Sequence, residues 1–264
     1  MVVSVVLGQG QEKRVMSIIQ DDENVVAGRN GVKELFKSGK PIDKIYIQRG
    51  IEESFASFVR KSAQAIHVPV TVADKSRLDE LARNHQGVVA LLPIRKYVTV
   101  DEILHSAYEK GEKPFIVISD GISDPQNLGA LIRCAECAGV HGIIIPKHNA
   151  ATITAAVSKS SAGALEHMLI SKVNSVAAAI DDLKDRNIWV YGLEADGSDY
   201  REAKFDSGTA VVLGSEGSGM SRLVRERCDF VLSIPMYGKV NSLNVSTAAS
   251  IVLFKAAESL KGSR

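Results

Sequence analysis

Cysteine is scarce in this chain of 264 residues: there are only three, at positions 134, 137 and 228. An odd and sparse set of thiols argues against a disulfide framework and is typical of reduced cysteines in the cytoplasm. Long apolar runs are also lacking, since no stretch approaches the roughly 18 uncharged residues of a membrane-spanning helix. We therefore expect a cytoplasmic protein with no membrane partner.

A strong net charge is lacking as well, because 32 Lys and Arg residues balance 31 Asp and Glu residues to give +1. The distribution is uneven, however. Residues 24–98 hold 13 basic and 7 acidic residues, so this segment is +6 and the remainder is −5. A basic front segment predicts contact with a polyanion such as a nucleic acid. An ordinary solvated lysine-rich surface is the alternative.

The pattern of the front part predicts a small α/β domain over residues 24–96. Val32, Leu35 and Phe36 recur at helical spacing, and Ile45 and Ile47 alternate as in a strand. We expect helices at 31–38, 53–65 and 75–83, and strands at 44–48, 69–72 and 88–92.

Two flanking segments lack such a pattern. Residues 1–23 have no basic start or cleavage site of a secretory signal, and we expect a flexible N-terminal extension with Met16 as an alternative start. Residues 97–113 are polar and charged, and we expect a partly helical linker there.

Residues 114–264 show a longer and more regular alternation of strands and helices. We expect strands at 115–119, 142–145, 165–170, 188–193, 210–213 and 230–234, and helices at 128–138, 175–184, 220–228 and 245–260. Such alternation predicts an α/β fold with a mostly parallel sheet and helices on both faces. Ligands of these sheets bind beyond the carboxyl ends of the strands.

Two turns of the second part are suited to a ligand. The strand at 210–213 runs into Gly214-Ser-Glu-Gly-Ser-Gly219, three glycines around one carboxylate, and glycine lets a ligand approach the backbone closely. Ser242-Leu-Asn-Val-Ser246 opens the last helix with short polar side chains. Together they predict one pocket. The glycine spacing differs from the dinucleotide fingerprint Gly-x-Gly-x-x-Gly.

Three segments carry a family signature. They read Asn127-Leu-Gly-Ala-Leu-Ile-Arg133, Leu213-Gly-Ser-Glu-Gly-Ser-Gly219 and Ile234-Pro-Met-Tyr-Gly-Lys-Val-Asn-Ser-Leu-Asn-Val-Ser246. Occurring in this order within one expected domain, they resemble the three motifs of the SpoU (TrmH) family of RNA ribose 2′-O-methyltransferases, which use S-adenosylmethionine. Residues 26–35 and 85–90 are similar to the family's small RNA-binding domain, which resembles a ribosomal protein.

This resemblance implies more than periodicity can show. It implies a deep trefoil knot in the domain 114–264, a homodimer formed through that domain, and active sites near the dimer interface. A front domain over 24–96 is typical of the RlmB-like branch, which modifies a guanosine in 23S rRNA. The implied partner is therefore large-subunit rRNA. No metal is implied, and no His/Cys/Asp ligand cluster is visible.

The resemblance also implies the site. Arg133 is the central catalytic residue; because a guanidinium rarely loses its proton, we expect it to bind the target phosphate and steady the developing alkoxide. Glu216 is expected to hold Arg133 or its neighbouring backbone. Asn127, Ser242 and Asn244 are expected to fix the ribose and the cofactor by hydrogen bonds. For the cofactor we expect backbone contacts from Gly214, Gly217 and Ile234, and apolar contacts to the adenine from Leu213, Met236 and Leu243.

Several of these residues have a plainer interpretation. Arg133 is also compatible with a surface helix arginine, Glu216 with a helix-start carboxylate, and Asn244 and Ser246 with caps of the last helix. For Cys134 and Cys137 we expect core-facing thiols rather than a redox or zinc half-site, and for His85 and His167 structural roles. Within the third motif, Tyr237 and Lys239 are compatible with RNA contact or with a solvated turn. Asp120 and Asp124 are expected to form the turn into the motif helix.

Three functions stay open at this level. The first is 2′-O-methylation of large-subunit rRNA. The second keeps the reaction but changes the substrate to tRNA, or to the rRNA site that confers thiopeptide resistance; short tRNA-type relatives usually lack the front domain. The third is a non-catalytic RNA-binding protein with a vestigial cofactor pocket.

Overall fold

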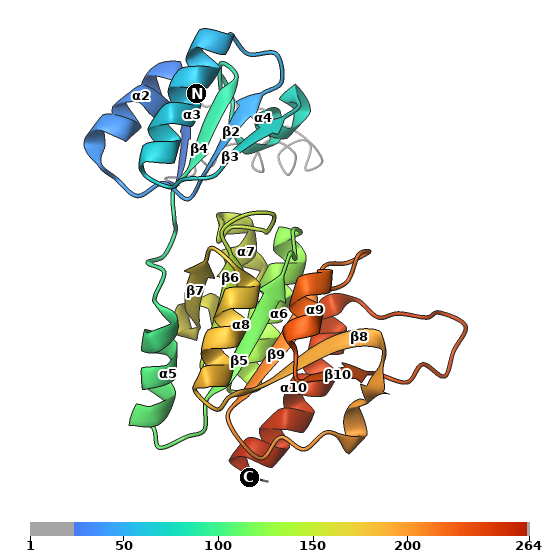
Figure 1. Cartoon of the computed structure of the whole chain (residues 1–264). Coiled ribbons are helices and arrows are strands. Elements are labelled where there is room, and N and C mark those ends of the chain that lie inside the picture. The colour runs from blue at the N-terminus through green and yellow to red at the C-terminus, as the bar shows by residue number, and fades with distance from the viewer. Residues whose placement is uncertain (1–23, 263–264) are drawn as a thin grey trace, which may run out of the picture. The chain divides into compact units, whose positions relative to one another are not determined.

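The computed structural model describes residues 24–262, and its chain divides into two compact units after Leu92 (Figure 1). The expectations of a flexible segment at 1–23 and of an alternative start at Met16 lie outside the described residues. Among residues 24–262, no helix is both long and apolar enough to cross a membrane.

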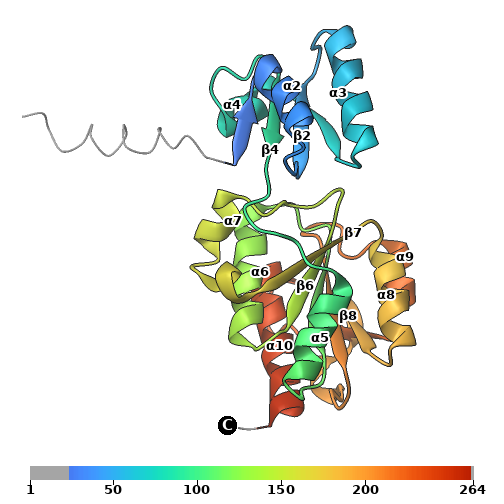
Figure 2. The same cartoon turned by 90° about the vertical axis from the view of Figure 1, so that its left-hand side faces the viewer.

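The first unit is a four-stranded sheet with helices on both faces (Figure 2). Its strand order is β1-β4-β2-β3, in which only the β2–β3 pair is parallel. Helices α2 and α3 share one core with the sheet, and α4 packs against the other face. The elements are β1 (Val25–Ala27), α2 (Arg29–Ser38), β2 (Lys44–Gln48), α3 (Glu53–Ala65), β3 (Val70–Ala73), α4 (Lys75–Leu81) and β4 (Val88–Leu91). The expected elements are confirmed, and β1 is additional because three residues give no periodic signal.

The second unit is a six-stranded sheet of order β10-β8-β9-β5-β6-β7, and all its strand pairs are parallel. This confirms the expected α/β class. Its strands are β5 (Phe115–Asp120), β6 (Gly142–Pro146), β7 (Leu169–Val173), β8 (Trp189–Asp199), β9 (Thr209–Gly214) and β10 (Phe230–Ser233). The trefoil knot that the resemblance implies stays a prediction.

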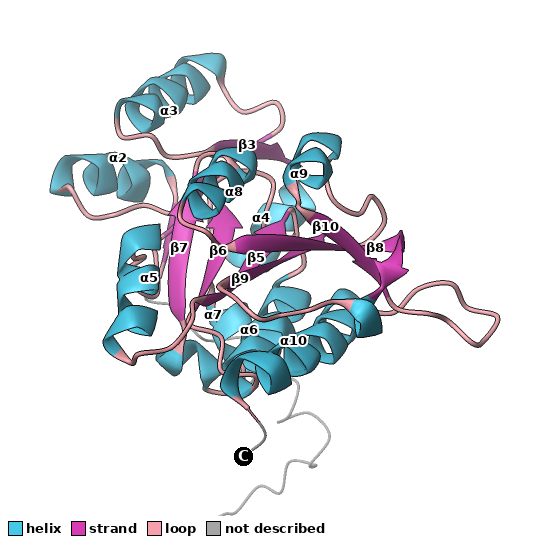
Figure 3. Cartoon of the chain, turned by 60° about the horizontal axis from the view of Figure 1, so that its bottom comes forward, coloured by secondary structure: helices cyan, strands magenta, loops and turns pink. Residues whose placement is uncertain are grey.

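Helices cover both faces of this sheet, as Figure 3 shows with α8 and α9 above it and α6 and α10 below. The two faces form separate apolar cores. The helices are α5 (Val100–Glu109), α6 (Pro125–Cys137), α7 (Ala155–Ser160), α8 (Val176–Asp185), α9 (Arg222–Arg227) and α10 (Val245–Lys261), with short 3-10 turns η1 (Ala164–His167) and η2 (Tyr200–Glu202).

The segment 97–113 is partly helical, as expected, and its helix α5 belongs to the second unit. Thr99 and Glu102 form a reciprocal capping box at its start. Ile103, on the inner face of α5, is fully buried, and a Cβ on Gly142 of β6 would stand only 2.7 Å from its side chain. The many charged residues on the outer face hide this apolar contact in the sequence.

A difference concerns residues 165–170, for which a strand is expected. The structure has the 3-10 turn η1 there, and β7 begins only at Leu169. Gly163, with φ +90°, redirects the chain after α7 so that Ala164 and Leu165 are buried by a turn instead of a strand. The short helix α7 is also not expected from the sequence.

Candidate active site

The glycine turn after β9 is closed on itself. The backbones of Ser215 and Gly219 exchange two hydrogen bonds, each of 3.0 Å. A Cβ on Gly214 would stand 2.1 Å from the carbonyl carbon of Gly219, so no larger residue fits there. Gly217 has open space around it, so a side chain would fit, but its φ of +133° is a backbone conformation that favours glycine. The turn exposes Glu216 at the carboxyl end of the sheet.

Three predicted site residues from distant parts of the chain meet at this turn. The Asn244 side-chain nitrogen Nδ2 donates to Asn127 Oδ1 at 2.9 Å and to Glu216 Oε1 at 3.1 Å. Asn127 Nδ2 donates to the same oxygen of Glu216. We call Asn127, Glu216 and Asn244 the Asn–Glu–Asn cluster. It joins the start of α6, the glycine turn and the start of α10.

Helix capping positions the two asparagines. Asp124 caps α6 by accepting hydrogen bonds from the backbone N–H groups of Gln126 and Asn127, and Pro125 occupies the first helical position. Asn244 caps α10, since its Oδ1 accepts from Ser246 N at 2.9 Å and from Ser246 Oγ at 2.6 Å. Asn244 therefore acts both as a cap and as a member of the cluster, whereas Ser246 bonds to the cap.

Arg133 lies apart from the cluster. It is exposed on α6, six residues after Asn127, which is about 9 Å along the helix and about 240° around it. Within residues 24–262, no hydrogen bond or ion pair joins Arg133 to Glu216. The carboxylate of Glu216 bonds to the Asn127 side chain at the start of the same helix, and a role of Glu216 in holding Arg133 or its neighbouring backbone stays a prediction.

The residues expected around the cofactor lie on the strand, the turn and the segment between β10 and α10. Leu213 is buried, and Ile234 packs against the same apolar core. Met236 and Leu243 expose 36% and 41% of their surface, and Ser242 is also exposed. Two large apolar side chains open to solvent, on the segment that leads to Asn244 of the cluster, fit a cofactor with an aromatic base and a flexible polar part.

Two carboxylates accept hydrogen bonds from the backbone just after the glycine turn. Neither is among the site residues expected from the sequence. Glu194 of β8 accepts a hydrogen bond from Met220 N at 2.6 Å, and Asp120 of β5 accepts one from Ser221 N at 2.7 Å. Asp120 therefore secures the start of α9, not the turn into α6 as expected. Acidic residues at the carboxyl ends of the strands expected at 115–119 and 188–193 are the signal that could have found both.

The cysteines behave differently from one another. Cys134 is half-buried against α10, where its sulfur accepts a hydrogen bond from Ser250 Oγ, but Cys137 is exposed, so only one of the two expected core-facing thiols faces the core. Burial raises the pKa of Cys228 to about 12. In the described part of the chain, no group of three or more His, Cys, Asp or Glu residues is arranged to hold a metal ion.

Of the remaining residues, His85 has the expected structural role. Its Nδ1 accepts from Gly87 N at 2.9 Å, and its Nε2 lies 3.0 Å from Asp79. His167 is exposed at the end of η1. Tyr237 is 86% exposed, and its hydroxyl accepts from Arg201 at 3.1 Å; Lys239 is exposed as well.

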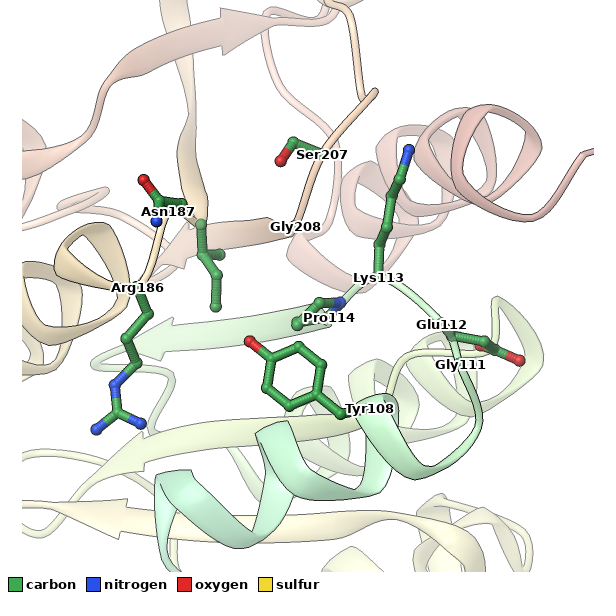
Figure 4. Close-up of a pocket in the computed structure, with 10 residues that line it drawn as sticks. Tyr108, Gly111, Glu112, Lys113, Pro114, Arg186, Asn187, Ser207 and Gly208 are labelled. Carbon is green, nitrogen blue, oxygen red and sulfur yellow. The ribbon is translucent and has the colours of Figure 1, made fainter.

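A pocket of about 430 Å³ lies at the amino ends of the strands, at the opposite end of the sheet from the glycine turn (Figure 4). Ile188, Pro114 and Gly208, which line it, directly precede β8, β5 and β9. Tyr108, Lys113 and Arg186, which are labelled in Figure 4, also line the pocket. Because the glycine turn follows the carboxyl end of β9, this pocket is not part of the candidate site.

Comparison with known proteins agrees with this architecture. The model of the SpoU rRNA methylase family matches residues 114–254, and the model described as RNA 2′-O ribose methyltransferase substrate binding matches residues 25–98. A Staphylococcus aureus protein, assigned by its name to the TrmH family of tRNA/rRNA methyltransferases, is 44% identical over 236 residues, which cover 89% of this chain and 95% of the relative.

Solved structures share the fold. The SpoU methyltransferase AviRb from Streptomyces viridochromogenes is 26% identical with a TM-score of 0.58, covering 95% of this chain and 93% of that one. The structure of the same protein in complex with the cofactor AdoMet is 24% identical to this chain, with a TM-score of 0.57 and the same coverage. A TrmH/SpoU tRNA modifying enzyme of A. aeolicus, 26% identical with a TM-score of 0.52, covers 61% of this chain and 84% of its own.

The fold, the site and these relatives define an RNA methyltransferase. The chain belongs to the SpoU rRNA methylase family.

Proposed function

We propose that this protein transfers the methyl group of S-adenosylmethionine to the 2′-hydroxyl of a ribose, and that the target is a guanosine of large-subunit 23S rRNA. The observation that carries the proposal is the Asn–Glu–Asn cluster, which joins all three family motifs beside the glycine turn. The 44% identity to a relative named for tRNA and rRNA methylation supports the RNA substrate.

The cofactor would be held largely by backbone groups. Gly217 has open space around its Cα, and Gly214 lets the end of β9 lie directly against the backbone of Gly219 and Met220. The backbone groups of Gly214 and Gly217 would contact the cofactor together with that of Ile234, which follows β10. Leu213, Met236 and Leu243 would contact the adenine. When bound, S-adenosylmethionine supplies a methyl group that its sulfonium already activates. The protein then has to align the hydroxyl and exclude competing orientations.

Hydrogen-bond capacity assigns different tasks to the cluster members. Asn244 uses both side-chain N–H groups on Asn127 and Glu216, and its oxygen accepts twice from Ser246, so its amide is saturated. Asn127 keeps one N–H group, and Glu216 keeps its second oxygen. Asn127 and Glu216 would therefore contact the ligands, with Ser242 nearby, and Asn244 would orient them.

Arg133 would act on the RNA. Its exposed guanidinium can bind the phosphate next to the target ribose and stabilise the developing alkoxide by charge. Since the guanidinium stays protonated, the hydroxyl proton would pass to phosphate or water. The exposed position of Arg133, away from the cluster, supports a role toward RNA over a role toward the cofactor.

The match of residues 25–98 to a substrate-binding model favours rRNA over tRNA, because the A. aeolicus tRNA modifying enzyme covers only 61% of this chain. A tRNA or the thiopeptide-resistance site of rRNA is the second candidate. The proposal includes a homodimer formed through the second unit. It also includes a cytoplasmic location, where the three cysteines would stay reduced, as free thiols.

The test separates an enzyme from a vestigial binding protein. Calorimetric titration should give S-adenosylmethionine binding by the wild type and by Arg133→Ala alike, whereas transfer to RNA should fall at least a hundredfold in the variant. A wild type that ignores the cofactor would support the non-catalytic alternative. Sedimentation of the same samples tests the dimer.

A further inference from the structure

An exposed aromatic ring flanked by cations lies on the first unit. Phe58 of α3 exposes 39% of its surface, although it is a large apolar residue. Its ring centroid lies 6.0 Å from that of Phe36 on α2, edge to face, and 6.0 Å from that of the buried Phe55. The two helices thus fix the ring on the face of the unit opposite to α4 (Figure 2).

Basic side chains surround this ring. Lys33 Nζ lies 6.0 Å from the centroid of Phe58 and 5.8 Å from that of Phe55, and the guanidinium of Arg29 lies 5.1 Å from the latter. Lys61 is exposed one helical turn after Phe58, on the same side of α3.

Most of this charge is not neutralised within the unit. Arg29 pairs with Glu52 at 2.8 Å, but within residues 24–262 neither Lys33 nor Lys61 forms an ion pair. Lys75 on α4, by contrast, is paired with Asp79 at 2.7 Å. The α2–α3 side therefore presents two lysines outside ion pairs together with an exposed ring, although Lys33 also interacts electrostatically with Glu52.

We propose that Arg29, Lys33, Phe36, Phe58 and Lys61 form a binding surface for an unpaired stretch of the RNA substrate, an inference that rests on the proposed function. A base stacks on Phe58, and the flanking phosphates lie against Lys33 and Lys61. Stacking on an aromatic side chain requires a base that is not paired in a helix. Cations along a strand and one aromatic platform are the combination that single-stranded nucleic acids bind.

The test uses the full chain and a labelled single-stranded RNA oligonucleotide, followed by fluorescence anisotropy. Phe58→Leu keeps the apolar volume but removes the stacking face, and we expect about tenfold weaker binding. Lys33→Gln should weaken binding and lower the slope of log affinity against log salt by about 0.7. Lys75→Gln, the same charge change on α4, should bind as the wild type does.

The outcomes are separable from those of the proposed function. Cofactor titration should be unchanged in all variants, because the surface lies in the first unit. Wild-type methyl transfer combined with unchanged RNA binding in Phe58→Leu and Lys33→Gln would overturn this inference alone. It would also be overturned if these variants altered the oligomeric state and not RNA binding, because the surface would then be a protein interface.

Discussion

The carboxylate of Glu194 lies where a side chain on Gly219 would otherwise be. Its Oε1 accepts a hydrogen bond from Met220 N at 2.6 Å and stands 2.6 Å from the position of a Cβ on Gly219, whose φ is +66°. The Glu194 carboxylate can lie in this position only because residue 219 is a glycine. From there it fixes the end of the turn that carries Glu216.

Glu194→Ala should loosen that turn. A hydrogen bond to a charged group contributes about 1.5–3 kcal/mol, so cofactor affinity should fall roughly tenfold to a hundredfold. Glu194→Gln retains an oxygen acceptor and should recover part of the loss. Glu258→Gln, an exposed change on α10, is the control, and equal cofactor affinity in all four proteins would contradict the positioning role.

Gly214→Ala should disrupt the site more severely. The new methyl group would stand 2.1 Å from the Gly219 carbonyl carbon and 2.2 Å from Met220 N, both backbone atoms that cannot move aside. We expect a loss of about 3 kcal/mol in unfolding free energy and no measurable cofactor binding. Gly238→Ala meets nothing within 4 Å and should resemble the wild type in chemical denaturation and in titration.

The two tasks of Asn244 can be separated. Asn244→Asp keeps an oxygen that caps α10, but it places a carboxylate beside Glu216 Oε1 and removes both donated hydrogen bonds. We expect near-normal thermal stability with methyl transfer reduced at least tenfold. Asn244→Ala should also lose about 1 kcal/mol from the cap.

A double variant tests the pairing directly. Glu216→Gln in the Asn244→Asp background removes the charge repulsion, so transfer should rise above that of Asn244→Asp alone. Strictly additive losses in this cycle would mean that residues 216 and 244 do not interact in solution.

The capping box of α5 predicts a dependence of stability on pH. Hydrogen bonds from the backbone N–H and the hydroxyl of Thr99 hold the pKa of Glu102 below its usual value of 4.5. A lowered folded-state pKa means that the contribution is complete above the unfolded value and is lost as the pH falls through the folded value. Glu102→Gln should therefore lower Tm at pH 7, and its difference from the wild type should shrink below pH 4.5. A pH-independent difference would contradict this.

Regular elements could be predicted from local patterns. Strands β5, β6 and β9 of the second unit each contain a continuous apolar run, and the glycine turn is recognisable from composition. Helix α5 is the counterexample: its apolar contact is with Gly142, far along the chain, and the polar outer face dominates the local pattern. The 3-10 turn at Ala164 is not predictable from the local pattern either. Ala164 and Leu165 are buried because the positive φ of Gly163 redirects the chain, and this has no periodic signal.

The pairing of residues at the glycine turn could not be predicted from the sequence. The motifs indicate Asn127, Glu216 and Asn244. In the sequence, however, Asn127 is 89 positions from Glu216 and 117 positions from Asn244. Only the tertiary fold decides that Glu216 bonds to the asparagines and not to Arg133. The hydrogen-bond partner of Glu194 is the backbone N–H of Met220, which no side-chain pattern in the sequence marks.

The most direct test of the account is methyl transfer itself. Purified protein should be incubated with S-adenosylmethionine carrying a labelled methyl group and with RNA from cells that lack the gene, and the RNA then digested to nucleosides. We expect label in 2′-O-methylguanosine from large-subunit rRNA, abolished by Gly214→Ala and retained by Gly238→Ala. Label on a base, or no transfer by a wild type that binds the cofactor, would contradict it.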